Sequence, residues 1–294
     1  MNSSEAANKG EKNSSKVGRA LNSGMAFIIA YLTVIVLFYL FTAVVGRMFG
    51  FDPQLYVYGI RFIVGRHRWS TGNAIVIWSS GTLFLLLLGR ICMALYRTFS
   101  ERLILFNLVA LWASIIAYAL AAAQTLFPIL ADYDETSHFY TNLAIAFNFA
   151  GVPVWALYVI CLVSLVWLAT GVSQIARLFL AFSYSFSKVN RRSRRRKYFV
   201  ETALLPFVIG STIILFFFHQ TYQFDNFDLQ NLVYTGVILL VLLLALLLAG
   251  MTEIGQDDVM RYKNLQQLNA VLFVVMMVML IGMVVLSHGI YLPF

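Results

Sequence analysis

Long apolar runs alternate with short polar connections along this chain. Seven of these runs are long enough to cross a lipid bilayer, at residues 25–46, 73–95, 103–127, 151–170, 200–218, 232–250 and 268–286. A helix rises about 1.5 Å per residue, so about 20 apolar residues span a hydrocarbon core of about 30 Å. A helix also satisfies its own backbone hydrogen bonds there. The pattern therefore predicts an all-α polytopic membrane protein with about seven transmembrane helices.

The composition leaves room for one membrane domain. Hydrophobic residues make up 61% of the 294 residues and charged residues 12%, and no stretch outside the apolar runs is long enough for a soluble domain. We therefore divide the chain into a polar N-terminal tail, residues 1–24, and a single transmembrane domain, residues 25–294. Cys92 and Cys161 fall within predicted spans, so neither a disulfide nor a thiolate metal site is indicated.

Three connections have patterns of their own. Residues 54–65 are rich in β-branched and aromatic residues, which predicts a short β-hairpin or a re-entrant element after the first helix. Residues 141–150 predict a half-helix at the outer surface. Apolar residues recur at helical spacing between residues 172 and 186, which predicts an amphipathic cytoplasmic helix at the membrane interface. Residues 172–199 are thus expected to be a basic amphipathic connector between the fourth and fifth spans.

Basic residues are concentrated in that connector. Seven of them fall within ten residues: Lys188, Arg191, Arg192, Arg194, Arg195, Arg196 and Lys197. Basic loops stay cytoplasmic, so the connector is expected inside the cell. The connections at 128–140 and 220–231 then lie outside, and neither contains Lys or Arg. The protein is therefore predicted in a bacterial-type inner membrane, with its N-terminus cytoplasmic and its C-terminus on the periplasmic side.

One connection departs from this charge rule. The segment at residues 47–68 counts as external but carries Arg47, Arg61, Arg66 and Arg68 against one acid, Asp52. The sequence assigns no role to these arginines.

Two interpretations of the seven basic residues remain open at this stage. They are a topology signal that anchors the connector on the cytoplasmic side. Alternatively they form a binding surface for anionic membrane lipids or for an acidic partner subunit, since each basic residue near an anionic leaflet contributes about 1 kcal/mol. Nucleic acid is not expected as a partner, because no nucleic-acid recognition fold accompanies the cluster.

The sequence does not indicate a metal or cofactor site. His67, His138, His219 and His288 all fall on the predicted outer side, and the last three are the best metal-ligand candidates there. No two of them have ligand spacing within one helix. The interiors of the apolar runs contain no acidic residue, which argues against an ion-driven carrier. We therefore predict no catalytic residue, no metal and no cofactor.

One stretch has a family resemblance. Residues 37–51, with the ending Arg47-Met-Phe-Gly50, resemble a helix of the site-2 protease-like membrane metallopeptidases. Residues 54–65 are similar to the β-hairpin of that family, and residues 79–89 to a later helix. The positions that would hold the family's His-Glu-x-x-His motif are Phe38, Tyr39 and Thr42, so the zinc ligands and the general base are missing. The resemblance implies a degenerate, non-proteolytic relative; the alternative is a simple packed first helix.

The spans offer packing surface and little chemistry. We therefore expect a non-catalytic integral membrane subunit or scaffold of a bacterial-type inner-membrane complex, in contact with membrane lipids and with other membrane subunits. The alternatives are a permease for an uncoupled or lipid-like substrate and a membrane enzyme with a site at the outer interface.

Overall fold

The computed structural model describes residues 3–56, 59–63, 69–98, 104–130, 142–183, 185–221, 225–255, 259 and 268–291. Within these ranges the side chains of residues 3–16, 142, 218–229 and 291 are not described.

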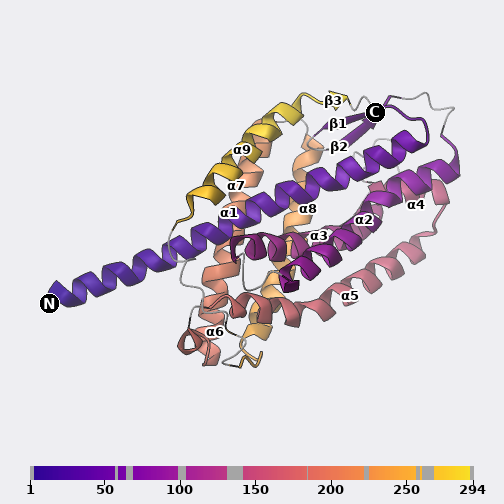
Figure 1. Cartoon of the computed structure of the whole chain (residues 1–294). Helices are drawn as coiled ribbons and strands as arrows, with labels where there is room; N and C mark the ends of the chain where they lie inside the picture. Colours follow the sequence, from indigo (N-terminus) through magenta and orange to yellow (C-terminus); the bar gives the residue numbers. More distant parts are fainter. Residues whose placement is uncertain are drawn as a thin grey trace.

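The described chain is predominantly helical (Figure 1). In chain order the elements are α1 (Ser3–Met48), β1 (Pro53–Tyr56), β2 (Gly59–Phe62), α2 (Thr71–Thr98), α3 (Ile104–Leu130), α4 (Asn142–Ala150), α5 (Val154–Ala181), the 3-10 turn η2 (Phe186–Lys188), α6 (Arg192–Phe199), the π-helical turn η3 (Val200–Leu204), α7 (Leu205–Thr221), α8 (Asp225–Ala249), α9 (Ala270–Ser287) and β3 (Ile290–Tyr291).

Seven helical stretches in the described part of the chain are long and apolar enough to cross a membrane. They correspond to the seven apolar runs of the sequence, and the fold is that of an all-α polytopic membrane protein. The fifth stretch, Arg192–Phe217, contains α6, η3 and the start of α7 in succession. The polar tail is helical as well, because α1 begins at Ser3.

The core is organised around α3. This helix packs against α1, α2, α4, α5 and α8, and α1 in turn packs against α2, α7 and α9. Trp112 of α3 is fully buried between Phe27 of α1 and Phe179 of α5, with ring centroids 5.0 Å from each. Small side chains such as Ala117 and Ala119 are also fully buried and let the neighbouring helices approach α3 closely.

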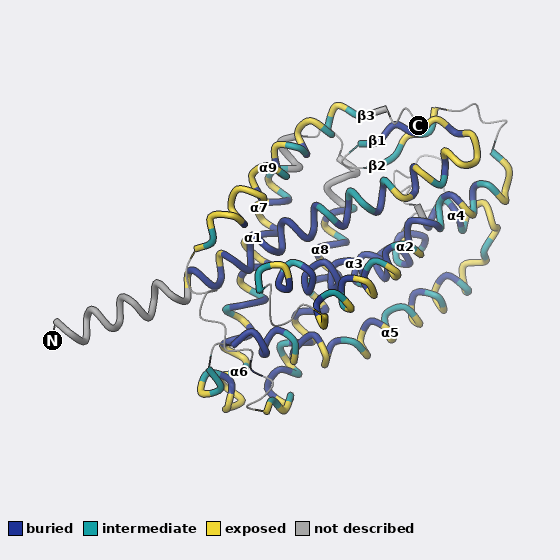
Figure 2. Tube along the Cα trace, viewed as in Figure 1, coloured by how far each residue is buried: buried dark blue, intermediate teal, exposed yellow. Residues whose placement is uncertain are grey.

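The outer helices leave broad apolar faces uncovered by protein. Figure 2 shows exposed positions along α5 and α9, whereas α3 and the middle of α1 are buried. On α5 the exposed side chains include Trp155, Leu162 and Val166. Apolar side chains on the outside of a membrane bundle contact lipid tails or other membrane helices.

A small sheet lies at one end of the bundle, called here the sheet end. Strands β1 and β2 form an antiparallel hairpin with Leu55 opposite Ile60, and β3 pairs antiparallel with β1 through Leu55 and Ile290. Phe62 of β2 packs against Trp78 of α2, with ring centroids 5.3 Å apart. The predicted hairpin is confirmed, and aromatic packing attaches it to the helices.

The opposite end, called here the basic end, contains α6. The start of the first span lies at this end, because Arg19 pairs with Glu201 of η3. The end of α2 is also here, since the ring of Tyr96 lies 5.9 Å from that of Phe182. The backbone amide of Asn269 donates a hydrogen bond of 3.0 Å to Asn22 Oδ1, which brings the start of α9 to the same end. The half-helix predicted at residues 141–150 corresponds to α4, beside the sheet end, where Phe149 lies 6.4 Å from Trp69.

The amphipathic helix predicted from the sequence has different surroundings in the structure. Residues 172–181 continue α5 without interruption, so they do not form a separate helix lying flat on the membrane. Their apolar face contacts protein: Val172, Ala176 and Phe179 are buried, and Phe179 packs against Phe199 with ring centroids 5.6 Å apart. The same apolar periodicity is compatible with burial in a protein core and with contact to a lipid surface. Only the neighbouring helices determine which of the two occurs.

Candidate functional site

The basic connector is attached to the end of α8 through two of its arginines. Arg195 Nη1 donates a hydrogen bond to the backbone carbonyl of Thr252. Arg196 lies against Gly250, where a Cβ atom would be 2.7 Å from Arg196 Nε. The absence of a side chain at Gly250 leaves room for this guanidinium beside the backbone. These contacts hold α6 in one orientation relative to the bundle.

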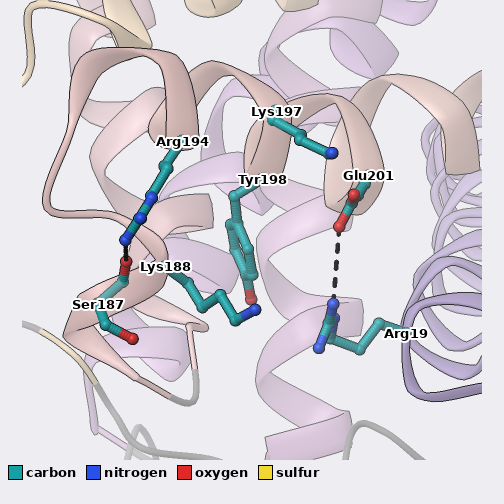
Figure 3. A pocket seen from close by; sticks show the side chains of 7 residues that line it. All are labelled: Arg19, Ser187, Lys188, Arg194, Lys197, Tyr198 and Glu201. Carbon is teal, nitrogen blue, oxygen red and sulfur yellow. Dashed lines mark hydrogen bonds and ion pairs between the residues drawn. The ribbon is translucent and has the colours of Figure 1, made fainter. Parts of the chain in front are cut away.

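A cavity of about 380 Å³ opens beside α6 at the basic end. We call it the basic pocket, and it is lined by Arg19, Ser187, Lys188, Arg194, Lys197, Tyr198 and Glu201. Figure 3 shows Lys188 and Tyr198 between the Arg194 and Ser187 pair on one side and the Arg19 and Glu201 pair on the other. The lining therefore comes from α1, η2, α6 and η3.

Hydrogen bonds fix the walls of the basic pocket. The Tyr198 hydroxyl donates to the carbonyl of Phe182 at the end of α5, at 2.8 Å. Ser23 Oγ of α1 donates to the carbonyl of Thr202 in η3 at 2.6 Å and accepts from Trp112 Nε1 at 3.1 Å. The π-helical turn changes the backbone hydrogen-bond pattern locally, and Ser23 supplies a donor to one of its carbonyls. Glu201 is thereby held opposite Arg19.

Positive charge dominates the basic pocket. Of its described lining residues, four are cationic and one, Glu201, carries a carboxylate. Arg19 is 6% exposed, lies 3.6 Å from the Glu201 carboxylate, and has its guanidinium carbon 5.7 Å from the Tyr198 ring centre. One carboxylate offsets only part of this charge. A concave, partly enclosed surface of one sign concentrates ions of the opposite sign.

The structure divides the seven predicted basic residues into three groups. Lys188, Arg194 and Lys197 line the basic pocket, and Arg194 Nη1 also donates to the Ser187 carbonyl at 2.8 Å. Arg195 and Arg196 contact the end of α8. Arg191 and Arg192, at the start of α6, are exposed and do not line the basic pocket.

Four residues of the basic pocket were not part of the predicted cluster, namely Arg19, Ser187, Tyr198 and Glu201. In the sequence Arg19 was only one of the charges of the N-terminal tail. Tyr198 is uncharged, so the search for basic residues did not include it. Glu201 is the second residue of the fifth apolar run, so the expectation of acid-free spans holds only for their interiors. One sequence signal did exist, because Lys197 and Glu201 are four residues apart and such pairs share a helix face. No local signal links Arg19 to them.

A second polar cluster lies inside the bundle. Tyr234 Oη of α8 accepts hydrogen bonds from Gln124 Nε2 of α3 at 2.5 Å and from Gln230 Nε2 at 2.8 Å. Gln230 Nε2 also donates to Tyr39 Oη of α1 at 3.0 Å. We call these four side chains the tyrosine–glutamine network. Its hydrogen bonds connect three helices across the membrane domain, which is a structural role.

The positions singled out by the peptidase resemblance are used in packing. A Cβ atom at Gly81 of α2 would lie 2.4 Å from Thr42 Oγ1 and 2.6 Å from a ring carbon of Phe38. Tyr39 belongs to the tyrosine–glutamine network. The three positions therefore provide helix contacts, and they carry no imidazole or carboxylate.

The histidine candidates remain untested as metal ligands. His288 is exposed at the end of α9, where its Nδ1 lies 3.1 Å from the Val284 carbonyl oxygen. His67 and His138 lie outside the described residues, and the side chain of His219 is not described. Among the described residues no group of three or more His, Cys, Asp or Glu side chains is placed to hold a metal ion. Cys92 and Cys161 are both buried as free thiols.

The structure describes two of the four arginines in the segment at residues 47–68. Arg47 forms an ion pair with Asp52 at the sheet end, and Arg61 lies in β2. Arg66 and Arg68 lie outside the described residues.

Comparison of the chain with protein-family models, with curated proteins and with solved structures found no match. The site is therefore interpreted from its own geometry.

Proposed function

We propose that this protein is a non-catalytic integral subunit of a bacterial-type inner-membrane complex, and that the start of α6 binds an acidic segment of a partner subunit on the cytoplasmic side. The proposal includes an N-terminus in the cytoplasm and a C-terminus on the periplasmic side, as the positive-inside rule predicts for α6.

The observation that carries the proposal is the attachment of α6. A topology signal needs only basic residues in a loop. Here Arg195 and Arg196 contact the end of α8, and Tyr198 contacts the end of α5. This leaves Arg191 and Arg192 exposed in a fixed position. Two exposed guanidinium groups at the start of a helix that is attached to the bundle are suited to bind carboxylates.

The exposed faces of α5 and α9 support the same proposal. They offer apolar surface for partner helices within the membrane, and the polar side chains of the tyrosine–glutamine network are engaged in contacts between helices. The described part of the bundle thus offers apolar packing surface to partner helices.

The test is purification of the tagged protein from its native membranes in a mild detergent, with the mass of the complex measured by native mass spectrometry. We expect a stoichiometric partner with an acidic cytoplasmic segment. Arg191→Gln combined with Arg192→Gln should weaken binding of the partner by up to about 25-fold, because each exposed ion pair contributes up to about 1 kcal/mol, or about fivefold in affinity. Raised salt should have the same effect, because exposed charges are screened beyond about 10 Å at 0.1 M.

The matched control is Arg61→Gln against Arg192→Gln. Both remove one exposed arginine, but Arg61 lies in β2 at the opposite end of the bundle. Recovery of the partner should change only with Arg192→Gln. A protein that purifies alone, or partner recovery that is insensitive to these variants and to salt, would contradict the proposal. Solute uptake by vesicles holding the lone protein would favour a permease instead.

A further inference from the structure

The basic pocket has the geometry and charge of a binding site, and we infer that it binds a phosphate group, carried either by the headgroup of an anionic membrane lipid or by a soluble phosphate compound. This inference is independent of the proposed partner, because Arg191 and Arg192 do not line the pocket.

The size of the cavity suits a small ligand. Binding sites for small molecules have volumes from about 300 Å³ upward, and the basic pocket measures about 380 Å³. It is partly enclosed by α1, η2, α6 and η3, so a bound group would be contacted from several sides. A simple cluster of basic residues on a flat loop would not provide this enclosure.

The donors in the basic pocket match the acceptors of a phosphate group. Lysine binds phosphate as a compact charge, and arginine presents several N–H groups in one plane. Arg194 uses Nη1 for the Ser187 carbonyl, and a guanidinium group has further N–H donors. Lys188 and Lys197 line the pocket from η2 and α6. Phosphate oxygens are strong acceptors for such charged donors.

The charge balance favours phosphate over a single carboxylate. Among the described residues that line the basic pocket, four are cationic and one, Glu201, carries a carboxylate, which is paired with Arg19. A phosphomonoester carries about two negative charges near neutral pH, whereas a carboxylate side chain carries one. A phosphomonoester therefore matches this excess of described cations better than a carboxylate side chain does.

The position of the pocket makes a lipid headgroup accessible to it. Arg19 stands at the beginning of the first membrane span, and Glu201 at the beginning of the fifth apolar run. Val200 and Leu205, on either side of Glu201 in sequence, are 36% and 44% exposed. Charged donors beside exposed apolar side chains provide contacts for both parts of an anionic lipid.

The test uses the purified, full-length protein and two separate probes. One probe is inorganic phosphate, added to the protein in detergent and followed by isothermal titration calorimetry. The other is phosphatidic acid in phosphatidylcholine nanodiscs, with lipid retention followed by native mass spectrometry. Binding of inorganic phosphate would show that a soluble phosphate compound is sufficient. Retention of phosphatidic acid without binding of inorganic phosphate would identify the lipid headgroup as the ligand. Either result supports a phosphate site.

Two double variants separate the pocket from general charge attraction. Lys188→Gln with Lys197→Gln removes two cations that line the basic pocket, and we expect about thirtyfold weaker binding of the probe. Arg191→Gln with Arg192→Gln removes the same charge from the same connector but outside the pocket, and should weaken binding by less than about threefold. Lys188→Arg with Lys197→Arg keeps the charge and should restore most of the affinity.

Thermal unfolding of every variant identifies any that fails to fold. The inference is overturned if neither probe binds the native protein, or if the two glutamine double variants weaken binding equally. If no protein partner is recovered but phosphate still binds, only the proposed function is contradicted. Failure of the proposed function is therefore distinguishable from failure of the phosphate inference.

Discussion

Gly81 shows at the scale of one residue how closely α1 and α2 approach. Its missing side chain makes room for Thr42 and Phe38, which are both buried. Small residues at such crossings allow the close backbone contact on which helix association in membranes depends. The small size required at position 81 is therefore set by side chains on another helix. The residues next to Gly81 in sequence do not reveal this requirement.

We expect Gly81→Val to destabilise the protein by about 1–3 kcal/mol, because the new side chain would overlap Thr42 Oγ1 and the Phe38 ring. Thermal unfolding in detergent should show a midpoint lower by several degrees. The matched control is Gly236→Ala in α8, where a Cβ atom would meet nothing within 4 Å. That change should leave the midpoint equal or raise it slightly. Equal destabilisation by both variants would contradict the close contact at Gly81.

At the scale of elements, the tyrosine–glutamine network connects α1, α3 and α8. Tyr234 is its central member, because its hydroxyl oxygen accepts from both Gln124 and Gln230. Tyr39 accepts from one amide, that of Gln230, and its further hydrogen bond with the Tyr234 hydroxyl is shared by the two tyrosines. Amide groups that lose a partner inside a membrane domain have little water to replace it. The two tyrosines should therefore differ in their contributions to stability.

Tyr234→Phe is expected to lower the free energy of unfolding by about 1–2 kcal/mol, since two amide donors lose their acceptor. Tyr39→Phe deprives one amide donor of its acceptor and should cost less, about 0.6 kcal/mol. Denaturation of both variants in the same detergent, compared with the native protein, measures the difference. A larger effect of Tyr39→Phe would show that Tyr234 is not the centre of the network.

The whole molecule has two distinct ends. The start of the first span, the end of α2, α6 and the start of α9 lie at the basic end, whereas the hairpin and α4 lie at the sheet end. Loops that the charge rule assigns to one side of the membrane are thus brought together in space. Which end faces the cytoplasm is a separate prediction, based on the positive charge of α6.

Cysteine labelling of intact cells tests this orientation. Ser193 in α6 and Ile63 after β2 are exposed at opposite ends of the bundle, and each is replaced by Cys in a background with Cys92→Ala and Cys161→Ala. We expect a membrane-impermeant maleimide to label Ile63→Cys in intact cells and Ser193→Cys only after the membrane is opened. Labelling of both from outside would contradict the topology, and the reverse result would invert the orientation.

The spans, the hairpin and the half-helix before Gly151 were predictable from the sequence because their signals are local. A run of about 20 apolar residues requires a helix in lipid, whatever surrounds it. β-branched and aromatic residues beside glycines favour a hairpin in the same local manner. The basic residues of the connector were also visible, since charge is a property of each residue alone.

The tertiary structure alone decided which of those charges form a site. Lys188, Arg194 and Lys197 line a pocket with Arg19, whereas Arg195 and Arg196 attach α6 to α8. Arg19 and Glu201 are far apart in sequence and meet only because α1 packs against η3. Periodicity likewise predicted a helix between residues 172 and 186. In the structure α5 ends at Ala181, and the apolar face of residues 172–181 is buried in protein only because other helices, α3 and α6 among them, pack against α5. Contacts between distant segments depend on how whole helices pack, and no local pattern in the chain encodes that.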